Sequence, residues 1–198
     1  MAGIPTSRPT NPHPPPHATA RAVGPARGPD VDLADPGRYL GAGELTWLRD
    51  HAARAAALLA AGGEVRVRVV ADPDMTRAHE RFHGVSSTTD VLTFDLSGAA
   101  PAHPVEPGEP STRALDADIL VCFDEAARQA RARGHAPEHE LLLYIIHGLL
   151  HCLGHDDTGE AAAARMHRAE DRTLEALGIG AVYARPARAV QPGPGAQQ

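Results

Sequence analysis

The sequence contains no lysine, only two cysteines and few aromatic residues. All 19 basic residues of the 198-residue chain are arginines and face 25 acidic residues. The resulting net charge of −6 excludes a globally basic nucleic-acid-binding protein, although a local arginine patch stays open. Cys122 and Cys152 cannot form a disulfide framework, which favours a reduced, cytoplasmic setting. Because aromatic residues make up only 4 % of the chain, a core must be built mainly from Ala, Val and Leu.

Long apolar runs are also absent. The longest aliphatic run, Leu141 to Ile146, is far too short to span a bilayer. The start of the chain has no apolar segment of the signal-peptide type. We therefore expect no secretory leader and no membrane partner.

Glycine and proline are abundant, with 19 and 18 residues, and they gather near both ends of the chain. Residues 1–36 and 184–198 have too few large apolar side chains to offset the entropy of ordering, so we predict two disordered tails, the first of them Pro-rich. Residues 37–183 are expected to form one domain, a size that is usual for a single core.

Hydrophobic periodicity predicts strands interleaved with helices in this domain. Valine and arginine alternate over Glu64 to Val70, which is the pattern of a half-buried strand. Strands are predicted at 64–70, 90–96 and 115–123, and helices at 45–60, 74–82, 124–133, 137–152 and 158–177. Residues 97–113 are rich in Pro and Gly and are expected to form a loop. The pattern indicates an α+β fold.

The strongest functional signal is the segment HGLLHCLGHDD, which begins at His147. His147 and His151 are four residues apart in a predicted helix, so their Cβ atoms lie roughly 5–6 Å apart on one face. Both imidazoles can then reach one Zn²⁺ at about 2.0–2.1 Å. Gly154 can end the helix and let the chain return with a third ligand. Three protein ligands leave a coordination position for water, as in catalytic zinc sites.

The spacing of the motif selects Asp157 as the third ligand, with His155 and Asp156 as competitors. A carboxylate binds zinc at a distance similar to that of a histidine nitrogen, but it lowers the charge of the site and makes the metal a weaker Lewis acid. Cys152 points off the ligand face and is expected to be a core residue. A metalloprotease would need Glu directly after the first His, and that position is Gly148.

The same segment resembles the H-G-x-L-H-x-x-G-x-D-H motif of the YbeY endoribonucleases of bacterial ribosomal RNA maturation. It departs from the motif at the last position, where the commonest residue is His and this chain has Asp157. Upstream, the stretch STTDVLTF from Ser87 is similar to the family's P-T-D-V-L-S-F, and LDADI is similar to L-G-D-I, with Asp118 on the family's Asp. The resemblance covers roughly 64–178. The family usually has an Arg two positions before Val85, where this chain has His83.

The resemblance implies a small mixed β-sheet of about four strands, flanked by helices, with the His-x-x-x-His helix beside it. It also implies a zinc-dependent, single-strand-specific endoribonuclease that acts on ribosomal RNA precursors and not on DNA. The partners would be the small ribosomal subunit and its assembly factors. His147, His151 and Asp157 would hold one Zn²⁺ per chain, which would polarise a phosphoryl oxygen, activate a water, or both.

Other residues near these motifs receive supporting roles. His83 is expected to contact phosphate or to take part in catalysis. Asp156 either orients a metal-bound His or is a solvated turn carboxylate, and His155 is by default an exposed turn residue with a possible part in proton transfer. The residues proposed to contact RNA are Arg66, Arg68, Arg77, Arg81, Thr89 and Asp90, of which the last two could instead satisfy turn amides.

Two other functions remain as alternatives. One is a non-catalytic ribosome-assembly or RNA-binding factor with a structural metal, and the other is a zinc peptidase-like hydrolase. Cleavage of single-stranded RNA that is lost on substitution of His147 or His151 would separate the endoribonuclease from the first alternative. Cleavage of casein would support the second.

Overall fold

The computed structural model describes residues 28–98, 103–108 and 112–180. Its elements in chain order are β1 (Asp30–Ala34), α1 (Ala42–Leu59), β2 (Gly62–Val70), α2 (Asp72–His83), β3 (Val91–Asp95), β4 (Ala114–Cys122), α3 (Phe123–Arg133), α4 (Pro137–Cys152) and α5 (Glu160–Ala176). Every helix and strand predicted from the sequence is present, and β1 is an additional strand. The predicted α+β fold is confirmed.

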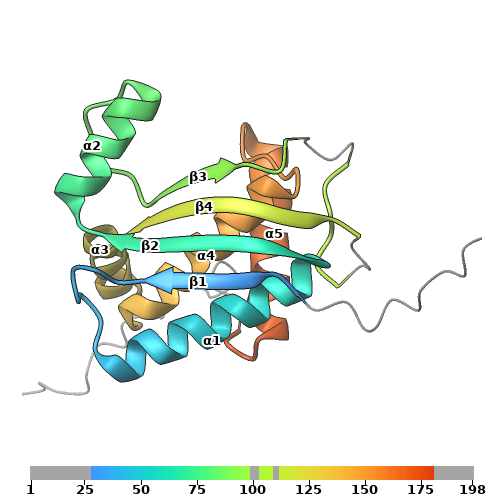
Figure 1. Ribbon diagram of the computed structural model, residues 1–198, viewed down its shortest axis with the longest axis horizontal. Coiled ribbons are helices and arrows are strands. Elements are labelled where there is room, and N and C mark those ends of the chain that lie inside the picture. Colours follow the sequence, from blue (N-terminus) through green and yellow to red (C-terminus); the bar gives the residue numbers. More distant parts are fainter. Residues whose placement is uncertain (1–27, 99–102, 109–111, 181–198) are drawn as a thin grey trace, which may run out of the picture.

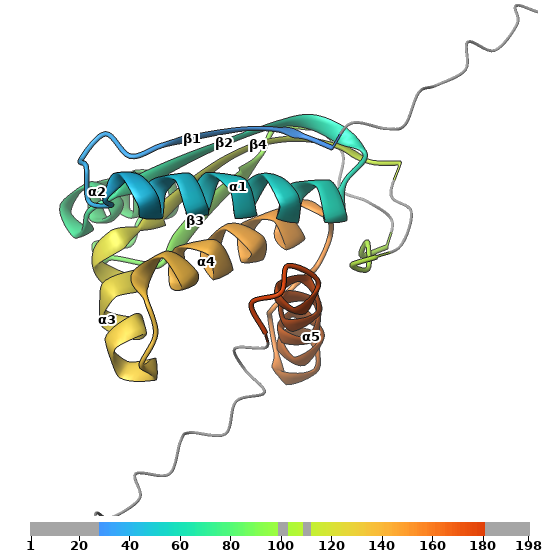
Figure 2. The same cartoon turned by 90° about the horizontal axis from the view of Figure 1, so that it is seen from below.

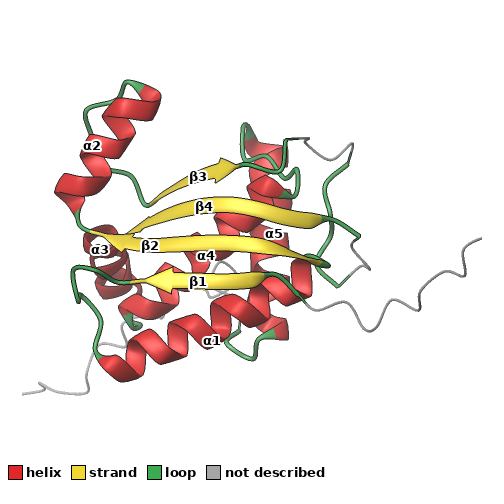
Figure 3. Ribbon diagram, in the orientation of Figure 1, coloured by secondary structure: helices red, strands yellow, loops and turns green. Residues whose placement is uncertain are grey.

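The four strands form one mixed sheet in the order β1-β2-β4-β3 (Figures 1 and 3). β1 and β4 both pair with β2 in parallel, whereas β3 pairs with β4 antiparallel. Parallel neighbours need a crossover connection, which α1 provides between β1 and β2. β3 is therefore an edge strand, and it borders the site described below.

β1 corrects the predicted limit of the first tail, because residues 30–34 were expected to be disordered. The strand has only two large apolar residues, Val31 and Leu33, so its local signal is weak. Its backbone pairs with β2, Leu33 is buried, and the Arg49 side chain donates a hydrogen bond to the Leu33 carbonyl. Of the predicted tails, residues 1–27 and 184–198 lie outside the described residues.

The core lies between one face of the sheet and the helices α1 and α4 (Figure 2). Val65, Val67 and Val69 of β2 point into this core, as the period of a strand dictates. α4 is buried on nearly all sides, because it packs against α1, α3, α5, β3 and β4. Apart from its first turn, its partly exposed positions are His147 and His151. No helix within the described ranges is long and apolar enough to cross a membrane.

Candidate metal centre

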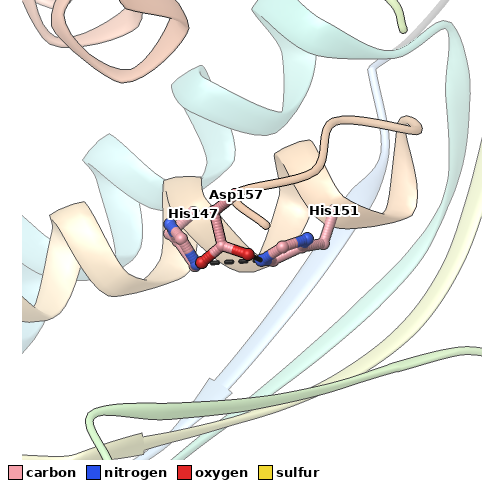
Figure 4. A group of neighbouring side chains, drawn as sticks. All are labelled: His147, His151 and Asp157. Carbon is pink, nitrogen blue, oxygen red and sulfur yellow. Dashed lines mark hydrogen bonds and ion pairs between the residues drawn. The ribbon is translucent and has the colours of Figure 1, made fainter. Parts of the chain in front are cut away.

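His147 and His151 lie one turn apart on α4 with their imidazoles facing each other (Figure 4). Their Nε2 atoms are 2.9 Å apart. Asp157 returns to the same place, with Oδ2 3.8 Å from Nε2 of His147 and Oδ1 4.0 Å from Nε2 of His151. One ligand atom from each residue lies within 4.8 Å of the others. The structure thus brings together the three residues that the motif spacing selected.

The turn after α4 carries Asp157 back over the helix. Gly154 has φ +88°, a left-handed conformation that suits glycine, and the His155 amide donates to the Leu150 carbonyl. The His155 ring is buried, contrary to the prediction of an exposed turn residue, and its Nε2 lies 2.8 Å from the Val105 carbonyl. His155 therefore anchors the turn to the loop between β3 and β4.

The two ligand imidazoles are oriented through their Nδ1 atoms. Nδ1 of His147 lies 2.6 Å from Oε1 of Glu170, a fully buried residue of α5. Nδ1 of His151 lies 3.1 Å from the carbonyl oxygen of His155. Among the described residues Asp156 has no hydrogen bond to either ring, and its Oδ1 accepts a hydrogen bond from the Thr158 amide, as a turn carboxylate does. His155 thus supports the site through its backbone.

Glu170 is the residue that motif reasoning missed. It belongs to the buried stripe of α5, which also contains Met166, Ala169 and Thr173. A glutamate on the apolar stripe of an amphipathic helix is costly to bury without a partner. The place of Glu170 on this apolar stripe is the one local sign in the sequence that the residue faces a buried basic group, which is the His147 ring.

These contacts leave both Nε2 atoms as acceptors. A carbonyl oxygen can only accept, so Nδ1 of His151 carries a proton, and the Glu170 carboxylate likewise accepts from Nδ1 of His147. In the neutral rings, two Nε2 lone pairs then face each other across 2.9 Å. Two ligands of a tetrahedral zinc ion are about 3.3 Å apart, so a small movement accommodates a cation between them. The donor set fits a metal ion.

Burial and charge act differently on the two histidines. Burial lowers the pKa of His147, but the hydrogen bond and charge of Glu170, together with Asp90 and Asp157, outweigh it and leave the pKa raised. Burial and the neighbouring His147 lower the pKa of His151. It is therefore unfavourable for both rings to be protonated to imidazolium at the same time. Two neutral rings that bind one cation between them avoid this repulsion.

A cavity of about 460 Å³ opens over the centre. The residues lining it include His83, Thr89, Asp90, Thr93, Asp95, Cys152 and the three candidate ligands. Three of the predicted residues, His83, Thr89 and Asp90, therefore lie beside the centre. Asp90 also accepts hydrogen bonds from the Thr89 hydroxyl and the Val91 amide, so this pair satisfies its own turn as well as lining the cavity.

Gly148 of α4 packs closely against β3 and β4. A Cβ atom at this position would lie 2.5 Å from Oγ1 of Thr93 and 3.3 Å from Cδ1 of Ile119. A glutamate after the first histidine, as a metalloprotease requires, would clash with the Thr93 side chain unless that side chain moved.

The arginines of β2 lie on the sheet face opposite to α4. Arg66 forms ion pairs with Glu64, Asp116 and Asp118, which neutralise its charge. These partners raise the pKa of Arg66 further, Asp116 most of all. Arg66 and Arg68 line a separate cavity and do not border the metal cavity.

The two arginines of α2 have contacts within their own helix. Arg77 forms an ion pair with Asp74 on the same helix. The Arg81 guanidinium lies 5.5 Å from the centre of the Phe82 ring, within reach of a cation–π contact. Neither residue borders the metal cavity, so the predicted arginine patch does not converge on the centre.

The fold and the site define a class: an α+β protein with a three-residue candidate metal centre, oriented by a buried carboxylate and open to a cavity. The family model described as Endoribonuclease YbeY matches residues 45–178. The chain belongs to this family.

Known relatives match over most of their length. The Endoribonuclease YbeY of Chloroflexus aurantiacus is 39 % identical over 131 residues, which cover 63 % of this chain and 83 % of the relative. The one from Shouchella clausii is 32 % identical over 158 residues, 76 % of this chain and 96 % of the relative. A solution structure of a Thermotoga maritima protein aligns with 83 % of this chain and 99 % of its own, at 20 % identity and a TM-score of 0.45.

Proposed function

We propose that this protein is a zinc-dependent, single-strand-specific endoribonuclease that acts on ribosomal RNA precursors in the cytoplasm, during maturation of the small ribosomal subunit. One observation carries the proposal: in a member of the YbeY family, His147, His151 and Asp157 converge at the floor of an open cavity. A bound Zn²⁺ would polarise a phosphoryl oxygen and lower the pKa of a water molecule to near 7.

The chain's own residues prepare the site for this chemistry. Glu170 and the His155 carbonyl hold the two imidazoles in the tautomer that presents Nε2 to a cation. His83 and Asp90 border the cavity; we assign His83 to proton transfer or to phosphate contact, and Asp90 to proton transfer. These groups are positioned by the end of α2, the residue before β3, α4 with the turn that follows it, and α5.

The charge of the cavity makes RNA binding depend on the cation. Asp90, Asp95 and Asp157 line it, so without a metal it repels a phosphate backbone. Of the arginines expected to contact RNA, Arg68 and Arg81 have no ion pair among the described residues. We keep these two as phosphate contacts at the margins, and assign Arg66 and Arg77 to ion pairs within the protein.

The test compares two neighbouring carboxylates. Asp157→Ala is expected to lose near-stoichiometric zinc, measured by elemental mass spectrometry, and to lose cleavage of single-stranded oligoribonucleotides. Asp156→Ala, one residue away on an exposed turn, is expected to retain both. Zinc retained in Asp157→Ala but lost in Asp156→Ala would overturn the ligand set. Full zinc content in a wild type that cleaves no RNA would favour a binding factor with a structural metal.

A further inference from the structure

The sheet has one face that the helices leave largely open. α1, α3, α4 and α5 all lie on the other side of the sheet (Figure 2). Among the described residues, α2 is the helix that packs on the open face, where Met75 joins Val70, Leu92 and Cys122 in a small cluster at one end. Beside this cluster lies a cavity of about 520 Å³, within the range of sites that bind small groups, roughly 300–1,000 Å³.

Two phenylalanines form an apolar wall of this cavity, which we call the aromatic groove. Phe82, near the end of α2, is 55 % exposed, and its ring centroid lies 4.8 Å from that of Phe94 of β3 in an edge-to-face arrangement. Leu96 lines the same groove and is 51 % exposed. Single exposed apolar side chains are ordinary on a protein surface, but a group of them in a cavity marks a binding surface.

The charged residues that line the aromatic groove are Asp32, Arg66, Arg68 and Asp118. Arg66 pairs with Asp118, so their charges cancel. Asp32 lies on β1, the edge strand farthest from the two phenylalanines. Arg68 is exposed and has no ion pair among the described residues, and the Arg81 guanidinium lies beside the Phe82 ring. Aromatic rings beside arginines are the combination that binds single-stranded nucleic acids, because bases stack on the rings and phosphates contact the arginines.

The aromatic groove adjoins the cavity over the metal centre. Along β3, Thr93 lines the metal cavity and Phe94 lines the groove, since successive side chains of a strand point to opposite faces. At the end of α2, His83 and Phe82 divide between the two cavities in the same way. β3 is the edge strand of the sheet, so a single strand of RNA can pass over this edge from one cavity to the other.

We propose that the aromatic groove is a second binding site for single-stranded RNA, in which a nucleobase stacks on Phe82 and Arg68 contacts a neighbouring phosphate. The proposal rests on the proposed endoribonuclease function and extends it, because strands long enough to fill both cavities bind more tightly than short ones. Stacking on an aromatic ring accepts every base, so the groove raises affinity without selecting a sequence. It also gives a role to an arginine of β2 that the metal cavity does not use.

The test compares substitutions of Phe82. Phe82→Leu removes the aromatic ring but keeps an apolar side chain, whereas Phe82→Tyr keeps the ring. The matched control is Leu58→Ala, since Leu58 is 38 % exposed on α1 and borders neither the groove nor the metal cavity. Binding of the full chain to two single-stranded oligoribonucleotides is measured by fluorescence anisotropy, with zinc and after a chelator has removed it. A trinucleotide fills the metal cavity alone, and a longer oligoribonucleotide also reaches the groove.

Phe82→Leu should bind the longer strand about fivefold to tenfold more weakly, in the lower part of the range for one stacked base, because leucine keeps part of the contact. The loss should be the same with and without zinc, and it should be absent for the trinucleotide, for Phe82→Tyr and for Leu58→Ala. Arg68→Gln should reduce the slope of log affinity against log salt concentration by about 0.7, the value of one phosphate contact on a single strand. Arg131→Gln, at an exposed position of α3, should leave that slope unchanged.

Unchanged affinity of Phe82→Leu for the longer strand would overturn the proposal, and so would an equal loss for the trinucleotide. A change in the sedimentation of the free protein on Phe82→Leu, without any change in RNA affinity, would assign the groove to a second copy of the chain instead. The proposed function fails separately. A wild type that binds the longer strand through Phe82 but cleaves no RNA would confirm the groove and refute the endoribonuclease.

Discussion

Glu170→Gln isolates the contribution of the buried carboxylate behind His147. The substitution keeps the shape of the side chain, and its carbonyl oxygen can still accept from Nδ1 of His147 across the same 2.6 Å contact. It removes the negative charge, and it replaces Oε2, a buried oxygen without a hydrogen-bond partner among the described residues, by an amide group. The change is therefore electrostatic more than steric.

We expect the substitution to weaken zinc binding but not to destabilise the metal-free protein. Loss of the Glu170 charge lowers the pKa of His147, and with it the basicity of Nε2 toward a cation. Loss of a partner behind a metal-bound histidine weakens metal affinity about 10–100-fold, or about 1.4–2.7 kcal/mol. The metal-free protein should be as stable as wild type or more stable, because the cost of burying a negative charge at Glu170 is removed.

The assay is a zinc titration against a chromophoric chelator, together with thermal unfolding of the metal-free proteins. Glu175→Gln is the control, since Glu175 is exposed on the same helix. Zinc affinities within twofold of each other in the two variants would show that Glu170 does not tune the centre, and the reasoning would be refuted.

Three further predictions test other parts of the structure. Gly148→Ala should destabilise the protein by about 1–3 kcal/mol through overpacking against β3, whereas Gly43→Ala, where a Cβ meets nothing within 4 Å, should stabilise α1 by about 0.5–1 kcal/mol, both by denaturant unfolding. The Arg128 guanidinium lowers the pKa of Asp72 to about 2, so stability is full above pH 4 and falls between pH 4 and 2. After allowance for solvent exposure this loss is about 1 kcal/mol, and pH-dependent unfolding of Asp72→Asn should lack it. Removal of zinc by a chelator should weaken oligoribonucleotide binding about tenfold, measured by fluorescence anisotropy, and an unchanged affinity would contradict the charge argument.

The convergence of the three candidate ligands was predictable because it depends on local geometry. A pair of histidines four residues apart on a helix, and a glycine that reverses the chain, place three side chains with no knowledge of the rest of the fold. Glu170 is 23 residues from His147 and on another helix, so its contact depends on how α5 packs against α4. No spacing rule covers such a pair.

In the sheet, too, features that depend on the local sequence were predictable, and features that depend on contacts between distant segments were not. Alternation in β2 correctly placed Arg66 and Arg68 on one face, but it could not tell which face the helices cover. Nor could it show that Arg66 stands opposite Asp118 in the register with β4. β1 was not predicted because it is short and has only two large apolar residues. Its pairing with β2 stabilises it more than its own sequence does.

The three candidate ligands differ in how firmly the chain holds them. The histidines belong to the most deeply buried helix, whereas Asp157 is about half exposed on a turn that His155 fastens to Val105. The two histidines are therefore held more rigidly than Asp157. Exchange of a bound cation would begin with release of Asp157, so Val105, through its contact with His155, would influence how long a cation stays bound.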